Sequence, residues 1–343
     1  MPHADPAQEA RTGPATTPPP RRAGRTGLDW RARLVLVGAV AVVLVACFLF
    51  LFVKGPLSFT LPRRATFVGA MAVVAFTQAV ATVAFHTVTG NRILSPSIIG
   101  FDSLYVLMQT AAVFALGGAT VQRADGLAGT VAQTVLMVVL ATLLYRWLFT
   151  SRRGGIVTLL LVGVVLGLAF DSLSSFLQRL LSPTEFDVLQ LDLFGRMGAV
   201  KAEELPLAVA VCALVGVLVW RRRDRLDVLL LGPEHATALG SSHRRELTTV
   251  LVLVSVLVAF STALAGPMTF FGFLVATLAY QVAGDWRHRA VLPMAFLLGF
   301  ATLVGGQFVL QHVFSANGYL TILLEGVGGL VFLTLLLRKK ALT

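Results

Sequence analysis

The chain has 343 residues, of which 56% are hydrophobic and only 13% are charged, and its formal net charge is +11 at pH 7. So few polar side chains exclude a water-soluble globular protein and favour one whose apolar surface faces lipid. The lysines and arginines lie between apolar runs and do not gather on one basic face, so we expect no nucleic-acid partner.

Residues 1–30 are rich in arginine, threonine and proline, with consecutive prolines at Pro18, Pro19 and Pro20. This composition cannot bury enough apolar area to order itself, which predicts a disordered cytoplasmic tail before a transmembrane domain at residues 31–343. The first apolar run, 34–53, is longer than a signal-peptide core and does not end in a small-x-small cleavage site. We therefore expect it to be a retained first span.

Further apolar runs follow, and a helix needs about 20 such residues to cross a bilayer. They predict an all-α, polytopic membrane protein with about ten transmembrane helices, at residues 34–53, 65–88, 97–118, 128–149, 156–181, 204–220, 246–265, 268–283, 291–312 and 319–337. With the N-terminus inside, about three quarters of the Lys and Arg residues fall on the cytoplasmic side, as the positive-inside rule requires. We expect a multi-pass protein of the cytoplasmic membrane with both termini in the cytoplasm.

Motifs for catalysis are missing from the sequence: there is no Walker A loop, GxSxG, HExxH or GxGxxG after a strand. Any ATP hydrolysis must therefore belong to another subunit. Cys47 and Cys212 stand alone in apolar runs, which predicts packing residues and no metal site.

Four ionisable side chains fall within or near the predicted spans, namely His86, Asp102, Asp171 and Glu325. A charge at the centre of a membrane helix costs about 2.5–3.5 kcal/mol, so each of them needs a reason. They keep an ion-coupled secondary transporter open as an alternative function. His86 and Asp102 lie nearer the ends than the centres of their spans, which favours structural groups bonded to a partner, and the same interpretation is preferred for Asp171.

The long cytoplasmic segment at about 221–245 begins RRRDRLDVLLLGPEHATALG and has the pattern of two short amphipathic helices. Its leucines are too few to span a bilayer, and an exposed leucine cluster among charges is typical of a docking surface. An interfacial helix lying on anionic lipid is the alternative, because three arginines open the segment. The residues alone favour neither interpretation.

Four blocks of sequence resemble the FecCD iron-siderophore permease family, to which the BtuC-type permeases also belong. They are LPRR from Leu61, TGNRILSPSIIGFDSLY from Thr89, LDVLLLGPEHATALG from Leu226, and GPMTFFGFLVATLAY from Gly266 followed by HRAVLP. The resemblance runs from about residue 56 to the C-terminus. It implies a BtuC-like fold of the type II ATP-binding-cassette importers, with no cofactor or metal on this chain.

Membership of this family implies the permease subunit of an importer that moves ferric siderophore across the cytoplasmic membrane by alternating access. Two ATPase subunits, which hold ATP and Mg²⁺, would dock on a coupling loop, and an extracytoplasmic binding protein would deliver the siderophore. The coupling residues that the resemblance implies are Leu226, Leu229, Leu230, Leu231, Gly232, Pro233, Glu234, His235 and Gly240. A permease for cobalamin or haem is the alternative within the family.

Gln307 and Gln311 stand where an acid and an arginine are frequent in the family, and Ala276 and Thr277 replace a common Pro-His pair. With these departures the sequence resembles the branch associated with catecholate siderophores such as petrobactin. Members of that branch often pair with a second, non-identical permease, which favours a heterodimer. Arg63 and Arg64 would meet acidic residues of the binding protein, because Thr60 stands where an arginine is frequent. Four side chains could face the pathway, although core packing is the preferred interpretation for them: Phe76, Gln78, Met108 and Gln109.

Overall fold

The computed structural model describes residues 28–53, 55–123, 126–150, 156–194, 200–314 and 320–340. Within these ranges the regular structure is helical throughout, so the predicted all-α class is confirmed. The predicted tail lies outside the described residues, apart from its last three positions.

Ten apolar helices of the described chain correspond one to one with the predicted spans. They are α1 (Trp30–Phe50), α2 (Leu57–Thr89), α3 (Phe101–Leu116), α5 (Leu127–Thr150), α6 (Ile156–Gln178), α9 (Leu205–Arg221), α12 (His243–Ala265), α13 (Phe271–Val282), α14 (His288–His312) and α15 (Leu320–Lys340). By length and composition, six of them could cross a membrane alone, and α9 could do so together with the helix that follows it. The other three are shorter apolar helices, α3, α13 and α15.

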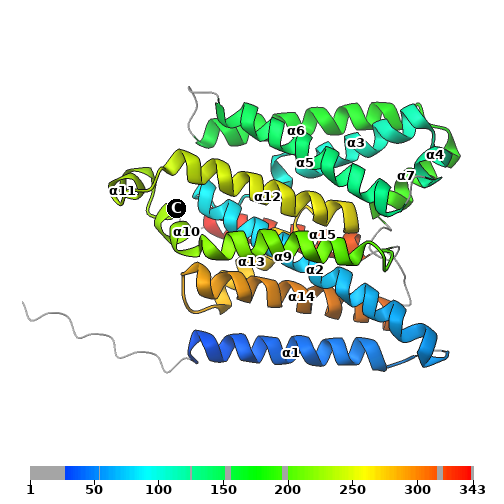
Figure 1. The fold of residues 1–343 in the computed structure, drawn as a ribbon, viewed down its shortest axis with the longest axis horizontal. Helices are drawn as coiled ribbons and strands as arrows, with labels where there is room; N and C mark the ends of the chain where they lie inside the picture. Colours follow the sequence, from blue (N-terminus) through cyan, green and yellow to red (C-terminus); the bar gives the residue numbers. More distant parts are fainter. Residues whose placement is uncertain are drawn as a thin grey trace, which may run out of the picture.

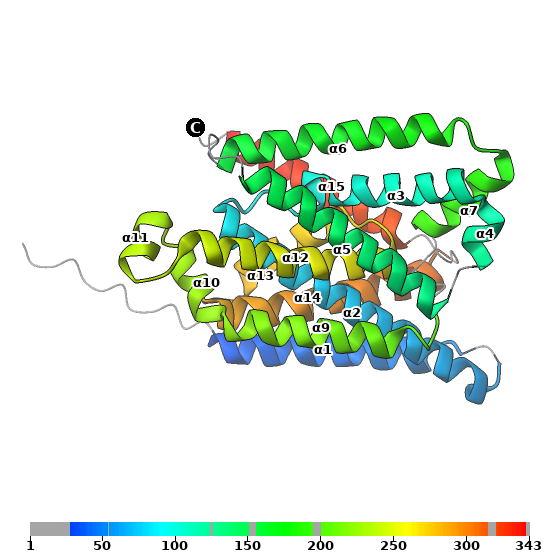
Figure 2. The ribbon, with the colours of Figure 1, turned by 45° about the horizontal axis from the view of Figure 1, so that its top comes forward.

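Short helices join these segments. They are η1 (Ser97–Ile99), α4 (Gly118–Arg123), α7 (Pro183–Phe194), α10 (Arg223–Leu229) and α11 (Pro233–Ala238). The start of α1, helices α10 and α11 and the end of α15 lie at one end of the bundle, on the left in Figure 1 and again in Figure 2. Helices α4 and α7 lie at the opposite end.

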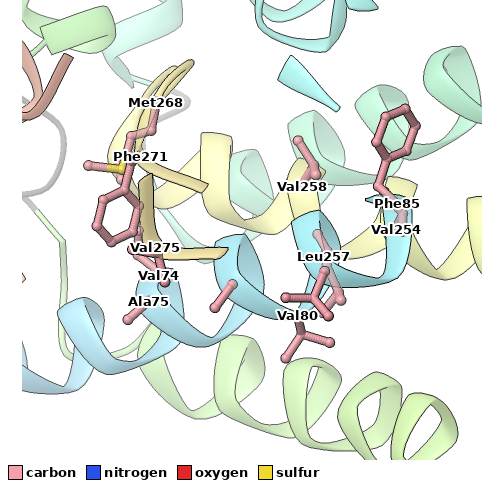
Figure 3. Close-up of a cluster of buried hydrophobic side chains, with 14 of the residues drawn as sticks. Val74, Ala75, Val80, Phe85, Val254, Leu257, Val258, Met268, Phe271 and Val275 are labelled. Carbon is pink, nitrogen blue, oxygen red and sulfur yellow. The ribbon is translucent and has the colours of Figure 1, made fainter. Parts of the chain in front are cut away.

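Helix α2 forms the centre of the bundle and contacts α9, α12, α13 and α14. Its 33 residues make a helix about 50 Å long, and its buried face consists largely of alanine and valine. Small side chains allow neighbouring helices to approach closely. The resulting van der Waals contacts hold the helices together in lipid, where no hydrophobic effect drives their association. Figure 3 shows the resulting contact of α2 with α12 and α13, made by Val74, Ala75, Val80, Val254, Leu257, Val258, Phe271 and Val275 among others.

Two spans begin part-way through the bundle instead of at its end. Gly100, just before α3, packs against Gly167 in the middle of α6, where a Cβ on Gly100 would come within 3.2 Å of the Gly167 Cα. Its φ of +100° is a second reason for glycine at this position. Helix α3 therefore has only 16 residues. Phe270, just before α13, likewise packs against Gly328 in the middle of α15, and α13 has only 12 residues.

The non-helical segments before these two helices bond to one another. The hydroxyl of Ser95 donates to the carbonyl of Thr269 over 3.1 Å, and the hydroxyl of Thr269 donates to Asp102 over 2.8 Å. The Thr269 amide donates to Glu325 of α15 over 3.3 Å. Irregular backbone at membrane depth needs such internal hydrogen-bond partners. We call residues 95–102, 266–270 and Glu325 the central junction.

Candidate docking surface

Residues 221–245, which we call the coupling segment, leave the bundle through a bend of 57° between α9 and α10. Gly232 begins α11 with φ of +90°, and Pro233 follows at the first helical position, where its missing N–H costs nothing. Gly240 ends α11 with φ of +80°. The amides of Gly240 and Ser241 donate to the carbonyls of Thr237 and Ala236, which is a Schellman motif. Gly232 and Pro233 thus begin the second of the two predicted short helices, and Gly240 ends it.

The leucines of the segment fall into two groups. Leu226 and Leu229 point into the bundle and are buried, with 1% and 4% of their surface exposed. Leu230, Leu231 and Leu239 point outwards and reach 64% exposure at Leu239. Glu234 and His235 are exposed beside them. The coupling segment therefore has an inner face that seats it and an outer apolar face that is free within the protomer.

Glu246, in the first turn of α12, closes the base of the segment. Its two carboxylate oxygens accept hydrogen bonds from Arg222 over 2.8 Å and from Arg225 over 2.6 Å. Charge-assisted bonds of this length are about twice as strong as neutral ones. Helix α10 is thereby fixed to the start of α12.

Asp227 connects the same helix to two further spans. One of its oxygens accepts from the backbone amide of His288 over 2.9 Å and lies 2.6 Å from Nδ1 of the same histidine. Because a carboxylate only accepts, Nδ1 carries the proton of that bond. The other ring nitrogen lies 2.7 Å from Oγ1 of Thr87 in α2. Neither Asp227 nor His288 was singled out from the sequence, since nothing in a sequence pattern pairs positions 61 residues apart.

At the opposite end of the bundle the two candidate arginines have different surroundings. The guanidinium of Arg64 donates to the carbonyls of Phe48, Leu49, Leu51 and Phe52, at distances of 2.7–3.3 Å, and so caps the end of α1. Arg63 is exposed. Of this pair, Arg63 is the residue free to meet a partner.

Helix α7 at this end starts with a capping box formed by Ser182 and Glu185. The carboxylate accepts from the Ser182 hydroxyl over 2.7 Å and from its amide over 3.0 Å. These bonds favour the charged form, so they hold the pKa of Glu185 below its ordinary value of 4.5.

The four candidate pathway residues lie inside the protomer. Gln78, Met108 and Gln109 are buried, with Gln78 next to the backbone of Gly272. Phe76 fills the space beside Gly216 of α9 and packs edge to face against Phe296 of α14. Packing and a pathway role both stay predictions for these four residues, because the second permease is not part of the structure.

The ionisable groups in the spans separate into buried and exposed ones. Asp102 is buried in the central junction, and His86 is buried with its Nδ1 3.2 Å from the hydroxyl of Tyr280. Asp171 is exposed on α6, next to Ser172 and one turn before Ser175, which are exposed as well. In the described part of the chain no three metal-ligating side chains come together.

Ten apolar segments around a small-residue core, with short helices and exposed leucines at one end, define a multi-pass membrane permease. The chain belongs to the FecCD transport family, whose sequence profile matches residues 34–338.

Three permeases of petrobactin import systems are similar to this chain in sequence. Over 90% of its length the chain is 38% identical to the petrobactin import system permease FatC of Bacillus anthracis, covering 89% of that protein. It is also 38% identical to the petrobactin import system permease YclO of Bacillus subtilis, over 90% of this chain and 98% of YclO. FatD, another petrobactin import system permease of Bacillus anthracis, is 26% identical over 77% of this chain and 76% of FatD.

A solved structure has the same fold. It is an inward-facing conformation of a transporter assigned to the metal-chelate type of ABC transporters, with a TM-score of 0.78 at 20% identity. The similarity covers 90% of this chain and all of the other.

Proposed function

We propose that this chain is the permease subunit of an ATP-binding-cassette importer that carries a ferric siderophore of the petrobactin class across the cytoplasmic membrane. The observation that carries the proposal is the coupling segment, which is seated by two buried leucines, tied by charged groups on two sides, and presents exposed leucines outwards. ATP and Mg²⁺ would be held by separate ATPase subunits. The similarity to two petrobactin permeases supports the substrate class.

The ATPase contact would be made by Leu230, Leu231 and Leu239 together with the exposed Glu234 and His235. Gly232, Pro233 and Gly240 would act through the backbone, because they set the turns that orient α11. Leu226 and Leu229 would hold the segment against the bundle. Closure of the ATPase pair on ATP would then move a preformed rigid element.

Arginines of the described chain support an orientation with this end in the cytoplasm. The coupling end carries Arg33, Arg92, Arg222, Arg225, Arg287 and Arg289, besides others of the coupling segment. The opposite end carries Arg63, Arg64, Arg123, Arg179 and Lys201. Since positive charge near span ends is retained inside, both termini of the transmembrane domain would face the cytoplasm.

The side of the protomer that meets the second permease would be the exposed face of α6. A carboxylate such as Asp171 on a lipid-facing helix costs about 2.5–3.5 kcal/mol at the membrane centre, which disfavours lipid as its neighbour. Ser172 and Ser175 extend the same polar stripe. A second, non-identical permease is the expected partner, since FatC and FatD are both named as permeases of petrobactin import in one organism.

The opposite end would receive the siderophore-binding protein. Arg63 is the exposed member of the arginine pair and would meet an acidic side chain of that protein. Arg64 would support it indirectly, by holding the end of α1 beside the start of α2.

The test is uptake of radioiron-labelled ferric petrobactin by proteoliposomes that hold this chain with its second permease, ATPase and binding protein. Uptake should require ATP and should stop when the Walker A lysine of the ATPase is replaced. Glu234→Arg and Gly232→Trp should detach the ATPase or abolish uptake, whereas the matched charge reversal Asp187→Arg in α7 should not. Normal ATPase copurification and uptake in both coupling variants would show that the contact lies elsewhere.

An ion-coupled transporter is the second candidate, because Asp102 and Glu325 meet the same threonine inside the bundle. It predicts uptake by the chain alone that a protonophore abolishes. Cobalamin and haem should be tested as competing substrates in the same vesicles. ATP-dependent uptake that is insensitive to a protonophore rejects this second candidate.

A further inference from the structure

The inference concerns Asp227, His288 and Thr87, and it rests on the proposed function. We propose that this hydrogen-bonded chain, which we call the coupling relay, makes the coupling segment move together with α14 and α2. Asp227 and His288 would be positioning residues for transport. They make no contact with ATP or siderophore, but they determine whether motion of α10 reaches the spans.

Covalent connections alone cannot carry that motion to the centre of the bundle. Helix α10 is joined through the chain to α9 on one side and, by way of α11, to α12 on the other. Helices α2 and α14 are remote in sequence, yet α2 is the helix around which the others pack. Some contact across space must therefore link the docking segment to them.

Apolar contacts are present but do not fix a direction. Leu226 and Leu229 of α10 are buried against the bundle, and packed apolar side chains can slide past one another in shear motions. Hydrogen bonds are directional and weaken steeply when they are misaligned. A short polar link between the same elements can therefore transmit a rotation that apolar packing would absorb.

The geometry of the relay fits this role. Asp227 bonds to His288 twice, through the backbone amide at 2.9 Å and the ring nitrogen at 2.6 Å, so the first residue of α14 is held at two points. The carboxylate also lies at the N-terminal end of α14, where the helix dipole favours negative charge.

On its far side the histidine ring is equally constrained. It is buried, with 2% of its side chain exposed, and Nε2 lies 2.7 Å from the Thr87 hydroxyl in the last turns of α2. That hydroxyl lies 3.0 Å from the carbonyl of Val83, one turn earlier. The chain of contacts thus passes from α10 through α14 into the backbone of α2.

The second polar tie of the segment serves as an internal comparison. Glu246 binds Arg222 and Arg225 but belongs to α12, which the segment already enters through the chain. Loss of that tie should loosen the base of the segment. Loss of the relay should leave the segment folded and docked, but disconnected from α2 and α14.

The experiment uses the complete importer in proteoliposomes and measures radioiron-labelled ferric petrobactin taken up per ATP hydrolysed. Asp227→Ala should lower this ratio by at least about tenfold, the order expected for lost charge-assisted hydrogen bonds. Thr87→Val keeps the side-chain shape and removes one neutral bond, so it should lower the ratio about threefold. Asp227→Asn still accepts from the His288 amide and should retain more coupling than Asp227→Ala.

The matched control is Asp224→Ala. Asp224 lies on the same helix, its side chain is 83% exposed, and its carboxylate is 3.7 Å from neighbouring Arg223. This variant should keep the wild-type ratio. ATPase copurification and ATP hydrolysis should stay near wild type in all the relay variants, which separates positioning from loss of the docking contact.

Three results would overturn the proposal: a wild-type ratio in Asp227→Ala and Thr87→Val, an equal fall in Asp224→Ala, or loss of ATPase binding in step with loss of uptake. The last result would make Asp227 part of the ATPase contact. Absence of ATP-driven uptake in the wild-type importer would instead reject the proposed function, so the two failures are distinguishable.

Discussion

Carboxylates in the central junction and carboxylates at the coupling end are held by different chemistry. Asp102 and Glu325 accept from the hydroxyl and the amide of Thr269, which are neutral. Asp227 and Glu246 are bonded to a histidine and to arginines. For Glu246 the difference follows from access to water, because the side chain of Arg225 is 63% exposed and keeps its remaining donors solvated.

The comparison indicates that the middle of the bundle is fixed by shape and neutral bonds, whereas the coupling end is fixed by charge. Substitutions in the centre should therefore act through sterics and desolvation, with little dependence on salt. Substitutions at the ends should be milder and should respond to salt or pH.

The largest effect is expected from Gly266→Ala in the central junction. Gly266 has φ of +78° and ψ of −177°, a region open almost only to glycine, and a Cβ there would collide with the Leu193 carbonyl. The strain alone is on the order of 3 kcal/mol. Thermal unfolding in detergent, followed by a thiol-reactive dye that reports exposure of Cys212, should show a lower midpoint. Gly326→Ala is the control, since a Cβ there meets nothing within 4 Å, and an equal midpoint in both variants would contradict the prediction.

Thr269→Val should come next, with a loss of about 2 kcal/mol, because it removes the hydroxyl of Thr269 that donates to the buried carboxylate of Asp102. The same dye assay measures it. In Thr249→Val, the control, the lost hydroxyl bond is an exposed one to the Arg245 carbonyl within α12. The loss in Thr269→Val should be the same at low and high salt. A loss that disappears at high salt would contradict the prediction, because it would show that charge stabilises the central junction as it does the coupling end.

Glu246→Gln should cost about 1 kcal/mol, because water can replace much of what the two arginines lose. The difference from wild type should shrink at 1 M salt, where the Debye length is about 3 Å. Midpoints measured across a salt series check this. Glu203→Gln, an exposed position before α9, should change little at any salt concentration. A salt-independent deficit in Glu246→Gln would remove the contrast between the two regions.

Glu185→Gln should give the smallest effect, and one that depends on pH. The folded pKa of Glu185 is depressed below 4.5 by the Ser182 bonds, so its contribution is present above that pH and is lost as the pH falls through the folded pKa. Wild type should therefore unfold at a slightly higher temperature than the variant at pH 7, and the two should converge under acid conditions. A difference that grows on acidification would contradict the assigned sign.

Much of the architecture could be predicted because hydropathy reports spans directly. The ten apolar runs each became a helix, and the charged segment at 221–245 contains the two short helices that its pattern predicted. Asp102 was expected near the end of its span, which is correct along the chain. That end nevertheless lies beside the middle of α6, because residues 90–100 re-enter the bundle. Periodicity carries no information about the depth at which a helix begins.

The contacts of the candidate site were less accessible to sequence reasoning. The leucines of the coupling segment looked equivalent, but a seven-residue helix divides them, so Leu226 and Leu229 face inwards while Leu230 and Leu231 face outwards. Nothing in the sequence distinguishes Arg64 from Arg63. Only the fold brings the end of α1 next to Arg64. Asp227 and His288 are far apart in the sequence, and only the tertiary fold brings them together.

The bond between Thr269 and Glu325 has a consequence for biogenesis. Helix α13, only 12 residues long, spans about 18 Å and is too short to be recognised by the translocon as a complete hydrophobic stretch. Its N-terminal turn receives its carboxylate partner only after the ribosome has synthesised α15. The innermost part of this protein is therefore completed last, when nearly the whole polypeptide is already in the bilayer.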